Sequence, residues 1–62
     1  MEFLHYKGGK YYLDSIADHT ETGERLAIYR DTKGNVWARP LEMFHGYVEV
    51  EGYRVKRFRR VF

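Results

Sequence analysis

The stretch Leu26-Ala27-Ile28-Tyr29 decides the fold, because four consecutive apolar residues make both faces of a strand apolar. Such a run predicts a strand that lies inside a sheet, with neighbours on both sides. Turn signals flank the run in both directions, at residues 8–9, 20–23, 32–35 and 51–52. Turns about every eight to twelve residues are typical of a small antiparallel sandwich or barrel.

Two other apolar runs, at residues 11–16 and 48–51, indicate which faces of the sheet are buried. Val48-Glu49-Val50-Glu51 alternates, which predicts a strand with one buried and one solvated face. Tyr11 and Leu13 share a face of another run, whereas Ile16 has the opposite parity. A β-bulge near Ser15 would bring all three side chains to one face.

The segment 40–46 interrupts the β pattern. It opens with Pro40, which suits the first position of a helix, and ends with Gly46, which suits the residue just past one. We predict one helical turn near residues 40–45 that places Leu41 or Phe44 in the core, followed by a final hairpin. Residues 1–62 are therefore predicted to form a single all-β domain, a small SH3-like antiparallel barrel of five or six strands.

Length and composition limit how this domain is stabilised and where it is found. A chain of 62 residues buries only about 60% of its unfolded surface, and without cysteine it has no disulfide to compensate. Aromatic residues make up 18% of the chain and must supply much of the core. No apolar run approaches the ~20 residues of a membrane span, and none resembles a signal peptide. We expect a cytoplasmic protein without a membrane partner, either a monomer or a weak homodimer.

Four blocks of sequence together carry a resemblance to a known family. They are His5-Tyr6-Lys7-Gly8-Gly9 with Tyr11; residues 17–24, ADHTETGE; Tyr29-Arg30 with residues 37–44, WARPLEMF; and Val48 and Gly52 with Arg57-Phe58. They resemble the bacterial domain of unknown function family 1653, and the third block is the most specific. The resemblance implies an SH3-like β-barrel and a bacterial cytoplasmic protein, but no function. The sequence departs from the family pattern at Asp14, at Lys56 and in a short loop before Trp37.

The sequence contains no catalytic or metal-binding motif. Asp14-Ser15 and Asp18-His19 have residues of catalytic triads, but strand neighbours face opposite sides and cannot act together. No glycine-rich phosphate loop or nucleophile elbow occurs. Each histidine stands alone in the sequence, and no cysteine pair supports a metal site. The histidines are His5, His19 and His45. We expect a protein that is not an enzyme and that binds no cofactor or metal.

The last ten residues hold five of the eleven Lys and Arg residues and none of the nine acids. The candidate basic patch consists of Arg54, Lys56, Arg57, Arg59 and Arg60. Cations interleaved with aromatic rings suit the phosphates and bases of nucleic acid. Alternatively, this segment closes the barrel through Phe58 and Val61. Its cations then pair with acids such as Glu42, Glu49 and Glu51.

Aromatic residues exceed what one small core needs, which predicts that some of them are exposed. The candidate aromatic binding surface consists of Tyr6, Tyr12, Tyr29 and Trp37. Aromatic-lined grooves bind extended peptides, although wide rings also fill small barrels. Arg39 is expected to pair with Glu42 or Glu24. The leading hypothesis is a non-enzymatic interaction module that binds a protein or peptide through exposed aromatics. The alternative is a nucleic-acid-binding accessory domain that uses the basic segment.

Overall fold

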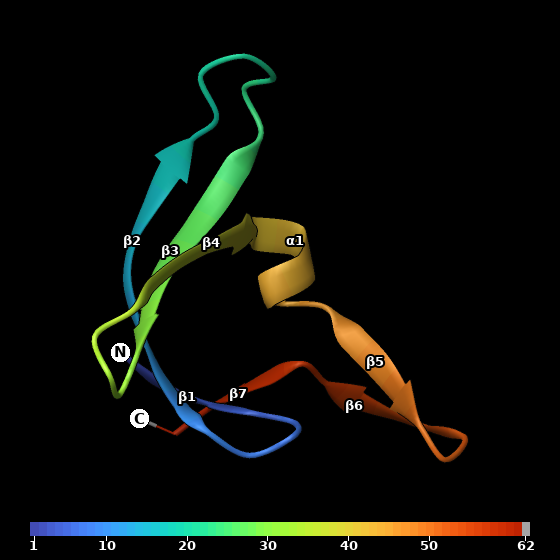
Figure 1. Cartoon of the computed structure of the whole chain (residues 1–62). Helices are drawn as coiled ribbons and strands as arrows, with labels where there is room; N and C mark the ends of the chain where they lie inside the picture. The colour runs from blue at the N-terminus through green and yellow to red at the C-terminus, as the bar shows by residue number, and fades with distance from the viewer. Residues whose placement is uncertain (62) are drawn as a thin grey trace.

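Each of the four predicted turns connects two strands in a computed structural model, which describes residues 1–61. Residues 1–61 form seven strands and one short helix (Figure 1). The elements are β1 (Glu2–His5), β2 (Lys10–Asp18), β3 (Arg25–Asp31), β4 (Val36–Pro40), α1 (Leu41–Phe44), β5 (Tyr47–Val50), β6 (Tyr53–Lys56) and β7 (Phe58–Arg60). The predicted all-β fold is confirmed.

Five strands form one antiparallel sheet in the order β4-β3-β2-β1-β7. The run 26–29 lies in β3, between β2 and β4, as its apolar faces predict. The last strand returns to the first, and the Val61 amide donates a hydrogen bond of 2.9 Å to the Glu2 carbonyl. Within residues 1–61 the sheet ends at β4 and β7 without pairing these strands, so it is not a closed barrel.

The predicted β-bulge is present in β2. Leu13 pairs with Tyr29, but the next pair joins Ser15 to Ile28, so one residue of β2 is extra. Ile16 consequently pairs with Ala27, and it lies on the same face as Leu13. Ile16 is nevertheless exposed, because β2 and β3 continue beyond the part of the sheet that α1 covers (Figure 1).

The predicted helical turn is also confirmed. Pro40 precedes α1 with an extended backbone, and Phe44 at the end of α1 is fully buried, while Leu41 is half-buried. Gly46 follows the helix for a steric reason. A Cβ at this position would lie 3.0 Å from the Glu42 carbonyl oxygen. Within residues 1–61 no helix has the length and apolar character needed to cross a membrane.

The core is a cluster of aromatic rings between the sheet and α1. The rings of Phe44 and Phe58 are stacked, with centroids 4.3 Å apart, and Phe3 meets Phe44 edge-on at 5.0 Å. The buried residues of the core are these rings together with Tyr29 and the small Ala27, that is, Phe3, Ala27, Tyr29, Phe44 and Phe58. Aromatic side chains bury about 150–250 Å² each, so a few rings suffice for so short a chain.

The β5–β6 hairpin extends away from the main sheet (Figure 1). Glu51 and Gly52 both have positive φ, of 51° and 82°, as a two-residue type I′ turn requires. Val48 is half-buried, but Val50 is exposed, so the predicted burial of a whole face of this strand is wrong. The reason is that the hairpin pairs only with itself and does not pack its apolar face into the aromatic core.

Candidate functional site

A hollow of about 520 Å³ separates the β5–β6 hairpin from β1 and β7. Leu4 and Arg59 are directly opposite each other in the β1–β7 pair, so both project from the face that does not carry the core residue Phe58. Val50 and Val55 contribute the hairpin's side of the hollow. The full lining is Leu4, His5, Tyr6, Gly8, Val50, Val55, Lys56 and Arg59.

Two cations of the predicted basic patch, Lys56 and Arg59, line this hollow, which is larger than a second hollow on the core side of the sheet. The other three lie elsewhere, so the five do not form one patch. Arg54 lies over the Tyr47 ring, 4.2 Å from its centroid. Arg60 is opposite Phe3, on the other face of β7 from Arg59. Arg57 is half-buried between β6 and β7.

The predicted pairing of these cations with Glu42, Glu49 and Glu51 is wrong for residues 1–61. Two ion pairs form in that range, between Lys10 and Glu2 at 3.5 Å and between Arg30 and Asp14 at 3.1 Å. Neither involves the basic C-terminal segment, because Arg54 lies against a ring and the hairpin stands apart from the helix that carries Glu42.

The four aromatic candidates do not share one surface. Tyr29 is 5% exposed and belongs to the core, so the prediction that its ring is exposed is wrong. Tyr12 pairs with Arg30, and its ring lies 4.7 Å from that guanidinium on the outer face. Trp37 is 49% exposed beside a second hollow, and Tyr6 is 37% exposed at the larger one. Of the four aromatic candidates, Tyr6 is therefore the one that lines the same hollow as Lys56 and Arg59.

Sequence reasoning missed Leu4, His5 and the two valines of the larger hollow. The alternation in residues 48–51 was the available signal, since it marks an apolar strand face. That face contributes Val50 to the hollow and is not covered by the core. Leu4 has no such signal in the sequence. It lines the hollow because β1 pairs with β7, a strand that is far from it in the sequence.

A smaller hollow of about 190 Å³ lies on the core side of the sheet. The Arg39 Nε donates a hydrogen bond of 3.3 Å to the Tyr29 hydroxyl, and Arg39 takes part in neither ion pair of residues 1–61, so its predicted pairing with Glu42 or Glu24 is wrong. β4 pairs with β3, which places Arg39 near Tyr29 and leaves both acids outside this hydrogen bond. The lining consists of His5, Tyr11, Tyr29, Trp37, Arg39 and Phe58.

His5 contributes to both hollows, and its surroundings favour the neutral imidazole. Burial, followed by the nearby charges of Arg39, Arg57 and Lys7, lowers the pKa of His5 from its ordinary value. Its Nδ1 accepts a hydrogen bond of 3.2 Å from the Lys7 amide. The Nε2 is therefore the nitrogen that holds the proton in the neutral ring.

The residues considered for catalysis have structural contacts of their own. Asp14 accepts both hydrogen bonds from the Arg30 Nε, and the His19 Nδ1 accepts hydrogen bonds from the amides of Glu21 and Thr22. Both contacts organise strand and turn geometry. Across residues 1–61, no three side chains of His, Cys, Asp or Glu gather as a metal site would require.

Comparison with known proteins identifies a family. The sequence model of a family described as "Protein of unknown function (DUF1653)" matches residues 1–60. No curated protein and no solved structure matches the chain.

Proposed function

Since the chain belongs to the DUF1653 family, whose function is unknown, we propose from the site itself that it is a non-enzymatic module that binds an extended peptide. The peptide lies in the larger hollow and carries apolar and acidic side chains. The single observation behind this proposal is that Val50 and Val55 face Leu4 across an open hollow with Lys56 and Arg59 beside it.

The size and walls of the hollow support a peptide ligand. About 520 Å³ lies within the roughly 300–1,000 Å³ that is usual for ligand sites. The walls come from two separate sheets, which leaves a hollow between strands. Extended peptides place alternate side chains on opposite sides, so one row enters such a hollow while the other remains in solvent.

The positive charges of Lys56 and Arg59 favour a ligand that carries acidic groups. Lys56 and Arg59 are exposed and take part in neither of the two ion pairs within residues 1–61. A carboxylate on the peptide gains charge-assisted hydrogen bonds from these side chains without displacing an internal partner. We therefore expect acidic residues next to the apolar ones in the bound segment.

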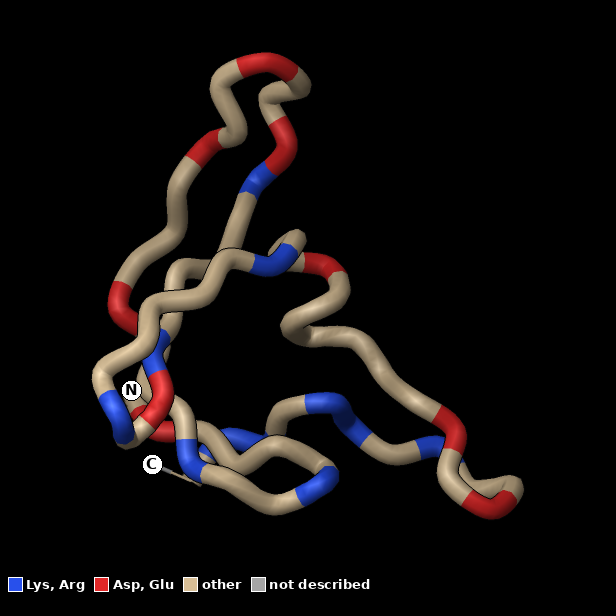
Figure 2. The backbone as a smooth tube through the Cα atoms, in the orientation of Figure 1, with Lys and Arg blue, Asp and Glu red and all other residues tan. Residues whose placement is uncertain are grey.

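Nucleic acid is the second candidate, because exposed rings lie close to cations on the hairpin. Arg54 covers Tyr47, and Tyr53 is largely exposed. The same hairpin also carries Glu49 and Glu51, so both signs of charge occur along it (Figure 2). Glu49 pairs with Arg54 on the face of the hairpin opposite Val50, so its carboxylate repels phosphates at the Arg54–Tyr47 surface. Neither glutamate lines the larger hollow, which favours the peptide there.

Amide chemical shifts of isotope-labelled protein test the proposal directly. The probe is a short blocked peptide of alternating glutamate and leucine, and a lysine–leucine peptide is the charge control. We expect the acidic peptide alone to shift amides lining the larger hollow, namely those of Leu4, Tyr6, Val50 and Val55. Equal shifts with both peptides, or shifts elsewhere, would contradict the proposal.

Charge variants separate the peptide from nucleic acid. Lys56→Gln with Arg59→Gln should weaken the acidic peptide about tenfold, whereas Arg25→Gln with Lys33→Gln, two exposed positions outside this hollow, should not. Binding of a single-stranded RNA pool to the same proteins is measured for comparison. Binding of RNA instead, with a log–log salt slope of about −0.7 per phosphate neutralised, would establish the second candidate.

We also infer that the fold is related to the SH3-like barrels. The return of β7 to β1 at the end of a four-strand antiparallel succession supports a partly open SH3-like barrel. The bacterial origin and cytoplasmic location stay predictions from the sequence resemblance.

A further inference from the structure

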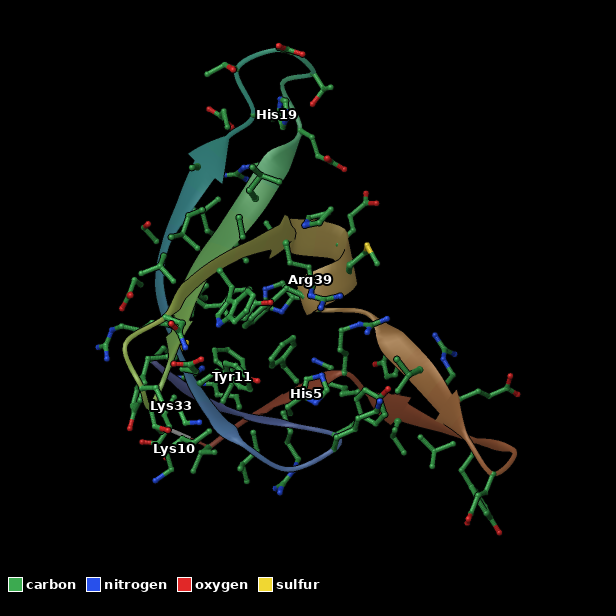
Figure 3. The ribbon with its side chains drawn as sticks, viewed as in Figure 1. His5, Lys10, Tyr11, His19, Lys33 and Arg39 are labelled. Atoms are coloured by element: carbon green, nitrogen blue, oxygen red, sulfur yellow. The ribbon has the colours of Figure 1, made fainter. Side chains whose placement is uncertain are left out.

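Three nitrogen-bearing side chains approach one another from separate parts of the chain. His5 comes from β1, Arg39 from β4, and Arg57 from the connection between β6 and β7. His5 and Arg39 line the same smaller hollow, and the charges of Arg39 and Arg57 both lower the pKa of His5. His5, Tyr11 and Arg39 all project into the region between the sheet and α1 (Figure 3).

This cluster has no acidic partner within residues 1–61. Arg39 donates to a tyrosine hydroxyl, and the buried Nε of Arg57 has no hydrogen-bond acceptor. The charged groups that act on His5 are Arg39, Arg57 and Lys7, all of them cations. A buried donor without an acceptor is rare in native proteins, and a water molecule or an ion usually meets such a group. Arg57 does not line the smaller hollow, whereas Arg39 and His5 both do.

The carboxylate near this region is already engaged. Asp31 accepts hydrogen bonds from the Asn35 amide group at 3.0 Å and from the Trp37 Nε1 at 3.2 Å. Its side chain is absent from the lining of the smaller hollow. Asp31 therefore fixes the indole in place and leaves the positive charge of Arg39 and Arg57 uncompensated.

The walls of the smaller hollow are aromatic. Tyr29 and Phe58 form its buried part, and the half-exposed Trp37 forms an outer wall beside Arg39. Its volume of about 190 Å³ is less than half that of the larger hollow, which suits a single ring. We propose that this hollow binds an aromatic carboxylic acid, with the carboxylate at Arg39 and His5 and the ring against Trp37.

The chemistry of each contact follows from the side chain. The planar guanidinium of Arg39 still has its terminal nitrogens for a two-point contact with a carboxylate, because its Nε serves Tyr29. The Nε2 of His5 donates the further hydrogen bond, since its Nδ1 is an acceptor. Arg57 lies outside the lining of this hollow, and its positive charge acts on His5. The ligand is either a free small acid or the end of a polypeptide, which share this chemistry.

Trp37 provides the assay, because it is the only tryptophan. Benzoate should change its fluorescence in a saturable way, and benzamide, which has the same shape without the charge, should not. N-acetylphenylalanine and its amide form a second pair, and tighter binding of this acid than of benzoate identifies a chain end as the source. No saturable response to either acid, or equal responses to acid and amide, would overturn the proposal.

Two further measurements keep the test independent of protein folding. Arg39→Gln should weaken benzoate about tenfold, with Arg25→Gln as the exposed control. In the unaltered protein, benzoate should raise the pKa of the His5 imidazole followed by NMR, because the anion favours the charged ring. An unchanged imidazole titration at saturating benzoate would rule out the contact with His5.

The peptide proposal and this one can fail separately. Amides of Val50 and Val55 report the larger hollow, and Trp37 reports the smaller one. His5 lines both hollows, so it is used only together with these reporters.

Discussion

Replacing Phe44 by alanine is expected to remove most of the stability of the fold. Its ring is fully buried, stacked on Phe58 at 4.3 Å and in contact with Phe3 and Tyr29 at centroid distances of 5.0 and 5.2 Å. Truncating a buried phenylalanine costs about 3–5 kcal/mol. A chain of this length has a free energy of unfolding of about 3–9 kcal/mol in all, at roughly 0.05–0.15 kcal/mol per residue. The loss is therefore comparable to the total.

Thermal and urea unfolding followed by circular dichroism would measure this loss. Phe44→Leu retains most of the apolar volume and should cost about 1–1.5 kcal/mol, which lowers Tm by about 4–12 °C in so small a domain. Met43→Ala is the matched control, since Met43 lies in the same helical turn but is 46% exposed, and its effect should stay within about 0.5 kcal/mol. If Phe44→Ala and Met43→Ala have equal effects, the assignment of Phe44 to the centre of the core is refuted.

Three other perturbations have outcomes that unfolding experiments can check. Gly46→Ala should destabilise the protein by about 1–3 kcal/mol, because the added Cβ meets the Glu42 carbonyl oxygen, and an unchanged Tm would contradict this. Glu51→Asn should stabilise the hairpin by about 0.5–1 kcal/mol, since asparagine tolerates the positive φ better; hydrogen exchange of the β5 and β6 amides measures it, and faster exchange would argue against the turn type. The lowered pKa of His5 means that the unfolded chain protonates first, so the free energy of unfolding should fall as pH drops through 6.5 toward the folded pKa. His5→Gln should lose this dependence in urea titrations, and an identical pH profile would show that another group causes it.

Features with a local cause were predictable from the sequence. The bulge in β2 follows from the parity of Leu13 and Ile16, and the helical turn follows from Pro40 and Gly46. The turns follow from their Gly and Asn residues. In each case the deciding interactions lie within a few residues, which sequence patterns describe well.

Features that depend on distant contacts were not predictable in the same way. Tyr29 is buried because the Phe44 ring of α1 and the Phe58 ring of β7 both pack against it. Arg39 meets the Tyr29 hydroxyl because β4 pairs with β3. The hairpin lies apart from the core although its alternation is that of a half-buried strand. The sequence pattern of a strand shows that one of its faces is apolar, but it does not show which other element packs against that face.

The pairing of β7 with β1 bears on how the protein is made. Synthesis proceeds from the N-terminus, so β1 leaves the ribosome long before the segment that completes its edge. Phe58, which closes the ring cluster, arrives at the same late moment. Until β7 has been synthesised, β1 therefore lacks its partner on one edge and the apolar cluster lacks Phe58. A stall in that interval would leave this edge available to chaperones or to other nascent chains.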